Sequence, residues 1–272
     1  MIKPLVSIII ATYNEEKNIK TLLESCSDQN YKDLEILVVD STRTTDKTSH
    51  IAKNFGVKVY KFGAERSVQR NYGVSKANGE YVLILDADMK LSASVVSECI
   101  NSHSEAVVIP EKSYGESYWA KCKALERNSY IGDPQIEAPR FFRKDIFIKA
   151  GGYNPQMISG EDWDLRERIK KIGKIGRIYE YIYHNEGKLK LLDDLKKKIY
   201  YAQMSGVYIE NNISDIKQIL LFFFRPAYFK NWKILLSDPI HFVGFIVMKF
   251  LEFLVGGIII VAKPNFWRKM VR

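Results

Sequence analysis

The sequence contains few cysteines, prolines and glycines. Its three cysteines, Cys26, Cys99 and Cys122, lie far apart. This odd number and wide spacing exclude a disulfide framework and a zinc motif, and they favour a reducing compartment. Proline and glycine number 8 and 16 among 272 residues, whereas 46% of the residues are apolar, so we expect a globular protein. No basic segment, apolar segment and small-residue cleavage site precede the first predicted strand, so we expect no cleaved signal peptide.

Acidic residues are fewer than basic residues, and almost all of this difference lies in the last third of the chain. The formal net charge is +9. From Gly187 onward there are 14 Lys or Arg and 6 Asp or Glu, and 14 − 6 gives +8 of that total. The first two thirds are therefore nearly neutral. A basic excess of this kind indicates nucleic acid, anionic lipid or an anionic small substrate as a partner.

Short apolar runs alternate with segments of helical periodicity in the first two thirds. The runs Leu5–Ala11, Leu34–Asp40, Tyr81–Leu85 and Ala106–Ile109 each have the length and composition of a buried strand. A further extended segment, Ala138–Phe142, is expected to be antiparallel. Strands that alternate with helices over short connections predict an α/β fold, with a mostly parallel sheet and helices on both faces.

Two acids follow the Tyr81–Leu85 run directly. Asp86 and Asp88 are separated by one alanine, at the carboxyl end of the predicted strand. Open α/β sheets bind their ligands at this edge. The two carboxylates repel each other unless a cation lies between them, and hard oxygen ligands suit Mg²⁺ or Mn²⁺. The alternative is an acidic surface turn.

Five segments in order resemble family 2 glycosyltransferases with the GT-A fold. They are Val6–Glu15 (VSIIIATYNE), Glu35–Ser41 (EILVVDS), Arg70–Gly73 (RNYG), Gly79–Asp88 (GEYVLILDAD) and Gly160–Asp162 (GED). The resemblance covers residues 4–190, so we expect a catalytic domain over 1–190 and a second region of basic and apolar helices over 191–272. It implies a Rossmann-like sheet, a nucleotide-sugar donor, Mn²⁺ or Mg²⁺, and hexosyl transfer.

The resemblance also implies roles for residues at the ends of the strands. Asp86 and Asp88 match the family's Asp-x-Asp element, which contacts the metal and the diphosphate or ribose. Thr12 and Glu15 lie where the family contacts the nucleoside, and Asp40 matches its base-contacting acid. The common Asp-Asp-Gly-Ser form is replaced here by Asp-Ser-Thr-Arg. This departure leaves the base open, and Asp40 could instead cap a turn.

Further site residues are expected on two helices and a late strand. Arg66 and Arg70 are four residues apart on one helix face. Arg70 matches the arginine of the family's Arg-Asn-x-Gly segment and is expected to approach the diphosphate, with Arg66 either beside it or solvated. In the family's Glu-Asp element, matched by Glu161 and Asp162, the aspartate is the general base; the alternative is that both acids cap a helix. His184 either completes the metal shell or has a structural role.

The last third predicts helices that associate with a membrane. Asp193–Gln203 is basic, Ile219–Phe224 is intensely apolar, and Ile240–Ala262 is long enough to span a bilayer. Basic residues follow this last segment, which argues against a single span from the cytoplasm and favours an in-plane helix or a re-entrant hairpin. The alternative is a buried core helix. Its small and polar residues form one stripe suited to a partner helix, which makes a homodimer an option: His241, Gly244, Lys249, Glu252, Gly256 and Lys263.

These features predict a membrane-associated, inverting, metal-dependent glycosyltransferase whose catalytic domain faces the cytoplasm. It would move one sugar from a UDP- or GDP-sugar to a polyprenyl-phosphate, a lipid-linked saccharide or another saccharide acceptor in glycan assembly. The Gln-x-x-Arg-Trp element of processive members is absent, which favours a single addition. One alternative is a phosphotransferase with an Asp-x-Asp nucleophile, although that pair usually follows the first strand. The other is a non-catalytic basic protein that binds nucleotide or membrane; no nucleic-acid partner is expected.

Overall fold

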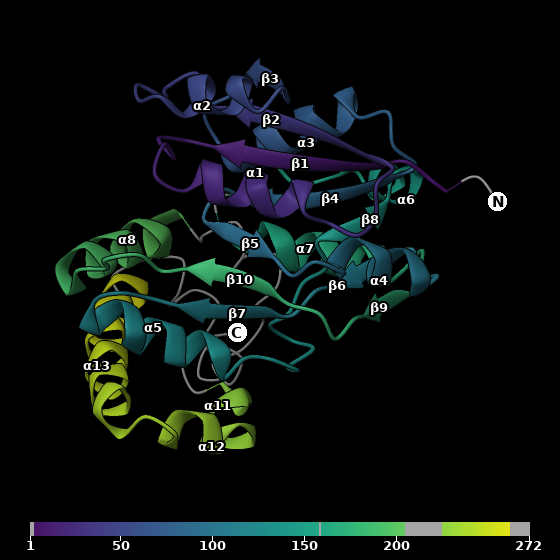
Figure 1. Ribbon diagram of the computed structural model, residues 1–272. Coiled ribbons are helices and arrows are strands. Elements are labelled where there is room, and N and C mark those ends of the chain that lie inside the picture. Colours follow the sequence, from purple (N-terminus) through teal and green to yellow (C-terminus); the bar gives the residue numbers. More distant parts are fainter. Residues whose placement is uncertain (1–2, 158, 205–224, 262–272) are drawn as a thin grey trace. The chain divides into compact units, whose positions relative to one another are not determined.

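The computed structural model describes residues 3–157, 159–204 and 225–261, and the chain forms two compact units (Figure 1). The first comprises residues 1–111, 134–155 and 161–184, and the second comprises 112–133, 156–160 and 185–272. The predicted boundary at residue 190 lies near the end of the first unit. Residues 112–133, which the sequence places inside the catalytic domain, group instead with the C-terminal helices, because their helix packs on those helices.

The first unit is built on a sheet whose described strands have the order β3-β2-β1-β4-β8-β6-β9. Strand β1 (Val6–Thr12) pairs in parallel with β2 (Leu34–Asp40) and β4 (Tyr81–Asp86), and β3 (Lys58–Lys61) pairs in parallel with β2. The expected antiparallel strand is β8 (Phe141–Arg143), which separates β4 from the parallel pair. That pair consists of β6 (Ala106–Val108) and β9 (Ile175–Arg177).

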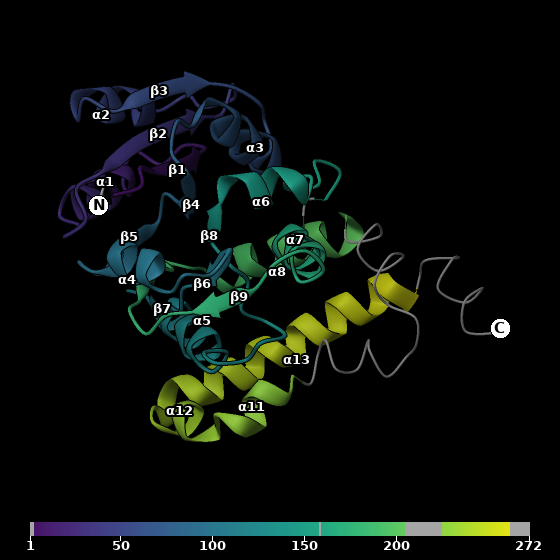
Figure 2. The same ribbon diagram turned by 90° about the vertical axis from the view of Figure 1, so that its right-hand side faces the viewer.

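Helices cover both faces of this sheet, as predicted (Figure 2). Successive residues of β1 point to opposite faces. Ile8 and Ile10 pack with apolar residues of α1 and α4, whereas Ile9 packs with those of α3, α6 and α7. The helices of this unit are α1 (Ile19–Ser27), α2 (Thr48–Asn54), α3 (Arg66–Lys76), α4 (Val95–Asn101), α6 (Lys144–Lys149) and α7 (Glu161–Ile169).

A short strand pair extends from the end of β4. Strand β5 (Met89–Leu91) begins one residue after Asp88 and pairs antiparallel with β10 (Ile182–Asn185). In this register His184 lies opposite Met89. The pairing therefore brings the predicted histidine of the last strand next to the acids that follow β4.

Helices dominate the second unit. After β7 (Glu111–Tyr114), they are α5 (Tyr118–Asn128), α8 (Leu191–Met204), α11 (Pro226–Lys230), α12 (Trp232–Leu236) and α13 (Pro239–Val261). The predicted helix at Asp193–Gln203 is thus confirmed, as is the one predicted at Ile240–Ala262 over its described part, which ends at Val261. Ile219–Phe224 and the basic residues after Ala262 lie outside the described residues. In the described parts of the chain, no helix combines the length and apolar character needed to cross a bilayer.

Candidate active site

The candidate site lies at the carboxyl ends of three neighbouring strands. Register places Thr12 of β1 opposite Asp40 of β2, and Ala11 of β1 opposite Asp86 of β4. Parallel strands bring their carboxyl ends to one edge, so residues distant in sequence meet there. The structure therefore brings Thr12, Asp40 and Asp86 to the same edge, as the sequence predicts.

Helix α3 carries Arg70 to this edge through a close approach to the sheet. A Cβ atom on Gly73 would lie 2.3 Å from Cγ2 of Ile9, so only glycine allows this packing. The neighbouring Asn71 fixes a turn before α7, because its amide donates to the Tyr153 carbonyl (2.7 Å) and accepts from the Tyr153 N–H (2.9 Å). The Tyr153 ring lies 5.1 Å from the Arg70 guanidinium.

Arg70 joins the acid after β4 to the acids of α7. Its fully buried guanidinium donates to Asp86 Oδ1 at 2.6 Å and lies 3.4 Å from Glu161 Oε1 and 3.3 Å from Asp162 Oδ1. Burial opposes ionisation of Asp86, but Arg70 and then Arg140 outweigh it, and they hold the pKa of that carboxyl well below its usual value. Asp86 is therefore a carboxylate at neutral pH.

The two acids of α7 have different surroundings. Glu161 is buried and also accepts from Arg66 Nη2 at 3.2 Å. Burial, followed by the charge of Asp162, raises the pKa of Glu161 above its usual value. The side chain of Asp162 is 35% exposed. Solvent and a hydroxyl group can thus reach Asp162, whereas Glu161 is enclosed by Arg66 and Arg70.

Two residues of the network were missed by the sequence reasoning. Arg140 donates through Nη2 to Asp86 Oδ2 (3.3 Å) and through Nε to Glu111 Oε1 (2.5 Å). Glu111 Oε2 lies 3.3 Å from His184 Nδ1, and His184 Nε2 lies 3.2 Å from Asp88 Oδ2. The sequence predicted Ala138–Phe142 as an extended, antiparallel segment, but not its pairing with β4. That pairing, seen in the Ile84 N–H to Arg140 carbonyl bond of 2.8 Å, places Arg140 beside Asp86.

The predicted metal ligands are only partly assembled. Asp88 lies beside His184, whereas both oxygens of Asp86 face arginines. Within the described ranges, no three or more His, Cys, Asp or Glu side chains are arranged to hold an ion by themselves. Asp88 Oδ1 is nevertheless buried with no hydrogen-bond partner. One hard oxygen donor is therefore available, and this fits a divalent ion that takes its remaining ligands from a diphosphate.

Asp40 is completely buried and fully hydrogen-bonded. Oδ1 accepts from the hydroxyls of Thr12 (2.8 Å) and Thr44 (2.6 Å), and Oδ2 accepts from the Ser49 hydroxyl and lies 3.1 Å from Lys61 Nζ. A carboxylate offers about four lone-pair sites, and protein donors fill all of them here. Asp40 thereby fixes the loop between β2 and α2.

Glu15 lies at the rim of the same edge. Its Oε2 accepts from the Asn18 amide at 2.8 Å, and its N–H donates to the Thr48 hydroxyl at 2.7 Å. Burial, followed by the nearby charges of Asp88 and Asp86, raises the pKa of Glu15 to about 7. The structure thus places Glu15 near the two acids, in agreement with its expected position at the end of the first strand.

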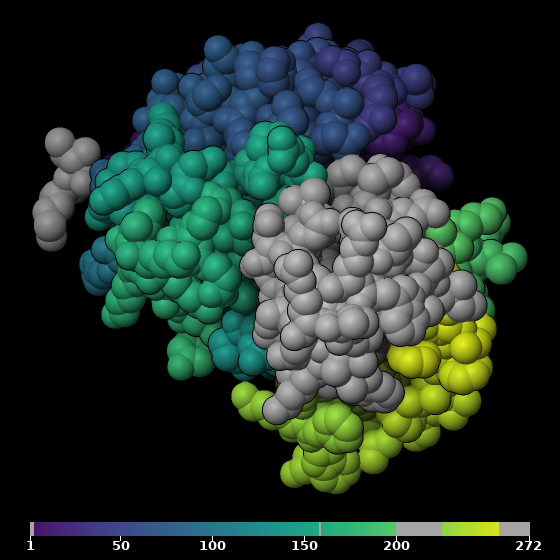
Figure 3. Space-filling view, turned by 180° about the vertical axis from the view of Figure 1, so that it is seen from behind, coloured from purple at the N-terminus to yellow at the C-terminus, as the bar shows by residue number. Residues whose placement is uncertain are grey.

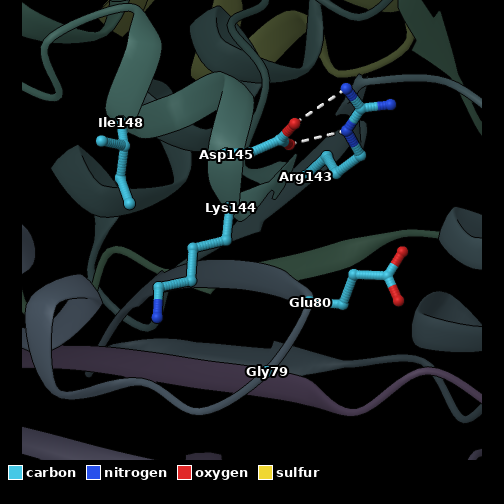
Figure 4. A pocket seen from close by; sticks show the side chains of 6 residues that line it. All are labelled: Gly79, Glu80, Arg143, Lys144, Asp145 and Ile148. Carbon is cyan, nitrogen blue, oxygen red and sulfur yellow. Dashed lines mark hydrogen bonds and ion pairs between the residues drawn. The ribbon is translucent and has the colours of Figure 1, made fainter.

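A pocket of about 460 Å³ lies elsewhere on the first unit (Figure 4). It is lined by Gly79, Glu80, Arg143, Lys144, Asp145 and Ile148. Gly79 precedes β4, so this pocket is at the amino end of that strand, opposite to Asp86. Arg143 is held by Asp145 through two hydrogen bonds of 2.6 and 2.9 Å. None of the predicted site residues lines it.

The sheet of the first unit is largely parallel, two aspartates lie at the end of β4, and Arg70 joins one of them to the acids of α7. These features define a glycosyltransferase of the GT-A class. The chain belongs to glycosyl transferase family 2, whose model matches residues 7–153. A relative in Campylobacter jejuni, GalNAc(5)-diNAcBac-PP-undecaprenol beta-1,3-glucosyltransferase, is 28% identical over 65% of this chain and 64% of its own length. The chain spans less than two thirds of the length of the curated relatives it matches.

Two solved structures share the fold. TarS from S. aureus, in complex with UDP, superimposes with a TM-score of 0.56 at 16% identity, over 97% of this chain and 91% of that one. A mannosyltransferase from Pyrobaculum calidifontis, in complex with GDP-Man and Mn²⁺, gives 0.55 at 18% identity, over 99% and 84%. At these identities, the likeness shows the fold alone.

Proposed function

We propose that this protein is an inverting, metal-dependent hexosyltransferase that moves one sugar from a UDP- or GDP-sugar to a lipid-linked acceptor, a polyprenyl-phosphate or a lipid-linked saccharide. The observation that carries the proposal is the position of Arg70. It contacts an acid of the metal–diphosphate element on one side and the solvent-accessible Asp162 on the other. The buried Arg70 side chain therefore connects the proposed donor site at Asp86 to the proposed general base, Asp162.

In this proposal the first unit binds the donor at the edge formed by β1, β2 and β4. Thr12, Glu15 and Asp40 shape the nucleoside end, and Arg66 and Arg70 lie toward the diphosphate. Asp88 would hold Mn²⁺ or Mg²⁺ with His184 beside it, whereas Asp86 would reach the ion only by releasing Arg70 or Arg140. The metal, when bound, supplies Lewis-acid stabilisation of the departing nucleoside diphosphate. The single Asp88 oxygen without a partner supports this assignment.

Asp162 serves as the general base. It takes the proton from the acceptor hydroxyl as the new bond from that oxygen to the anomeric carbon forms. The bond from the anomeric carbon to the phosphate oxygen breaks, and the nucleoside diphosphate leaves with both bonding electrons. Attack opposite to the leaving group inverts the anomeric centre. The structure argues against a phosphotransferase with Asp86 as the nucleophile, because both oxygens of Asp86 are held by arginines.

A lipid-linked acceptor and a membrane setting are supported by a relative and by the tail. The Campylobacter jejuni relative carries undecaprenol in its name. The basic excess and the apolar α13 lie in the second unit, which suits a surface that presents such an acceptor. We place the catalytic unit on the cytoplasmic side, because its cysteines Cys26 and Cys99 are free thiols, as is usual in a reducing compartment.

The role of Asp162 is tested with Asp162→Asn. The amide cannot accept the proton, so transfer should fall by roughly 10²–10⁴-fold, while donor affinity stays unchanged. Glu167→Gln makes the same carboxylate-to-amide change at an exposed position of α7 and should keep wild-type turnover. Turnover by Asp162→Asn equal to that of Glu167→Gln would remove Asp162 from the base role.

The donor is identified by thermal shift. Full-length protein is heated with UDP-, GDP- or dTDP-sugars, each with and without Mn²⁺. A donor that binds the folded state raises the melting temperature in proportion to its saturation. We expect one class of donor to stabilise the protein only when the metal is present. Stabilisation that is equal with and without Mn²⁺ would contradict metal-dependent binding.

A further inference from the structure

Helix α13 of the second unit has its polar side inward. Glu252 is buried and the side chain of Lys249 is 23% exposed, and both belong to the stripe that the sequence predicts to meet a partner helix. The partner is α5 of the same chain. A Cβ atom on Gly244 would lie 2.4 Å from Cys122 Sγ, and the Tyr118 hydroxyl donates to the Ile240 carbonyl at 3.0 Å. The described part of the stripe, from His241 to Glu252, thus already packs within the chain.

Ion pairs join this inner face of α13 to α5 and α8. Lys249 contacts Glu252 (2.6 Å) and Glu126 of α5, while Lys123 of α5 lies 3.1 Å from Glu126 and 3.5 Å from Glu252. Lys198 of α8 lies 3.6 Å from Glu252. Buried charges are tolerated only when they are paired in this way, and separating them is strongly unfavourable. The orientation of α13 about its own axis is therefore fixed by this cluster.

The opposite face of α13 is exposed and apolar. Ile240, Val243 and Phe250 are exposed by 71%, 62% and 61%. They lie on one side of the helix, because Val243 follows Ile240 by three positions and Phe250 follows Val243 by seven. Four more large apolar residues complete the face: Ile246, Val247, Phe253 and Leu254. The helix is yellow in Figure 3. Soluble helices bury such residues and expose their charges, so the arrangement here is reversed.

We propose that this outer face of α13 lies in the interface of a membrane that contains anionic lipids, with the helix parallel to the membrane plane. The membrane contact itself does not depend on the proposed function. Its role rests on the proposed function, because the contact would bring the catalytic unit to a lipid-linked acceptor. Only one face of α13 is available to lipid, because the ion pairs hold the other face against α5 and α8. A helix with one lipid-facing side lies in the interface rather than across it.

Charge and side-chain size favour lipid over a second copy of the chain. The second unit carries exposed Lys230 and Lys233 on the helices before α13, and Arg268, Lys269 and Arg272 follow α13 in the sequence. Basic residues beside an apolar helix attract anionic head groups. Close pairing of two α13 helices would instead favour small residues on the outer face, but from Ile240 to Leu254 the exposed residues of that face are all large and apolar, and Gly244 faces α5.

The test is flotation of the full-length protein with vesicles of phosphatidylcholine alone or mixed with phosphatidylglycerol. We expect binding to the mixed vesicles that weakens as salt is added. Phe250→Asp places a charge at the centre of the outer face and should weaken binding by roughly tenfold or more. Ile148→Asp is the matched control, because Ile148 is 59% exposed on α6 of the first unit, and it should bind like wild type.

Sedimentation and donor binding separate the outcomes. Equal vesicle binding by wild type and Phe250→Asp would overturn the proposal. A wild-type dimer that Phe250→Asp dissociates, without vesicle binding by either protein, would also overturn it and assign the face to a second copy. The metal-dependent thermal shift with nucleotide sugars does not involve lipid. If wild type shows no metal-dependent thermal shift with any nucleotide sugar, the proposed function is refuted. The membrane proposal is then still decided by the vesicle flotation alone.

Discussion

Replacing Arg70 by methionine should destabilise the first unit severely at neutral pH. Methionine fills much of the arginine volume but leaves Asp86, Glu161 and Asp162 without the cation that they share. Breaking a buried ion pair by removing one partner lowers the free energy of unfolding by about 3–5 kcal/mol. We place the change toward the lower end of that range, because Asp162 is partly exposed and Asp86 retains Arg140.

The pH dependence of this loss distinguishes charge from packing. The folded state depresses the pKa of Asp86 below its usual 3.8. The stability contributed by the ionised carboxylate is therefore fully present above that value, and it is lost as the pH falls through the still lower folded value. Urea unfolding of wild type and Arg70→Met should show a gap that is widest near pH 7 and narrows below about pH 4.

Arg143→Met supplies the control for this comparison. Arg143 pairs with Asp145 at the surface, where solvent screens the pair, so its loss should change the free energy of unfolding only slightly. A neutral-pH loss for Arg70→Met as small as that of Arg143→Met would refute the reasoning. A large loss that does not change between pH 7 and pH 3 would attribute the effect to packing rather than to charge.

Two further predictions concern acids at the rim of the site. Glu15→Gln should raise the melting temperature at pH 8. The folded state raises the pKa of Glu15 from 4.5 to about 7, so wild type loses stability as the pH rises from 4.5 to about 7 and remains less stable above that pH. The gain should therefore vanish near pH 4, and a gain of equal size at both pH values would contradict it. Asp40→Asn should lower the free energy of unfolding by about 1–3 kcal/mol, because one of its two oxygens becomes an amide that faces the donors Ser49 and Lys61. An unchanged urea midpoint together with an altered preference among nucleoside diphosphates would instead show that Asp40 contacts the base.

The sequence predicted the sheet edge better than the network behind it. Strands β1, β2 and β4 follow from uninterrupted apolar runs, and Asp40 and Asp86 are adjacent to those runs, so their meeting follows from parallel pairing. Arg140 and Glu111 could not be assigned in this way. Their positions depend on the antiparallel insertion of β8 beside β4, which is a tertiary pairing between short strands with weak local signals.

The second unit shows the same limit. The α13 helix and its polar stripe were visible in the sequence, because both depend on local periodicity. The helix that meets the stripe was not, since α5 lies 111 residues or more before α13, inside the segment that resembles the catalytic domain. Cys122 and Tyr118 have no local pattern that marks them as neighbours of Gly244. Only the packing of the folded chain shows that residues 112–133 belong with the tail.

Four consecutive residues of α3 connect three parts of the first unit. Arg70 pairs with the acids of the site, Asn71 hydrogen-bonds the turn at Tyr153, and Gly73 packs directly against Ile9 of the sheet. Each α-helical residue turns the chain by about 100°, so one residue inserted before Arg70 would rotate all three contacts away from their partners together. A change in length would therefore remove all three contacts at once, whereas a substitution at any one of these positions removes a single contact. The length of α3, together with the identity of Arg70, Asn71 and Gly73, keeps the sheet, the turn and the acids in alignment.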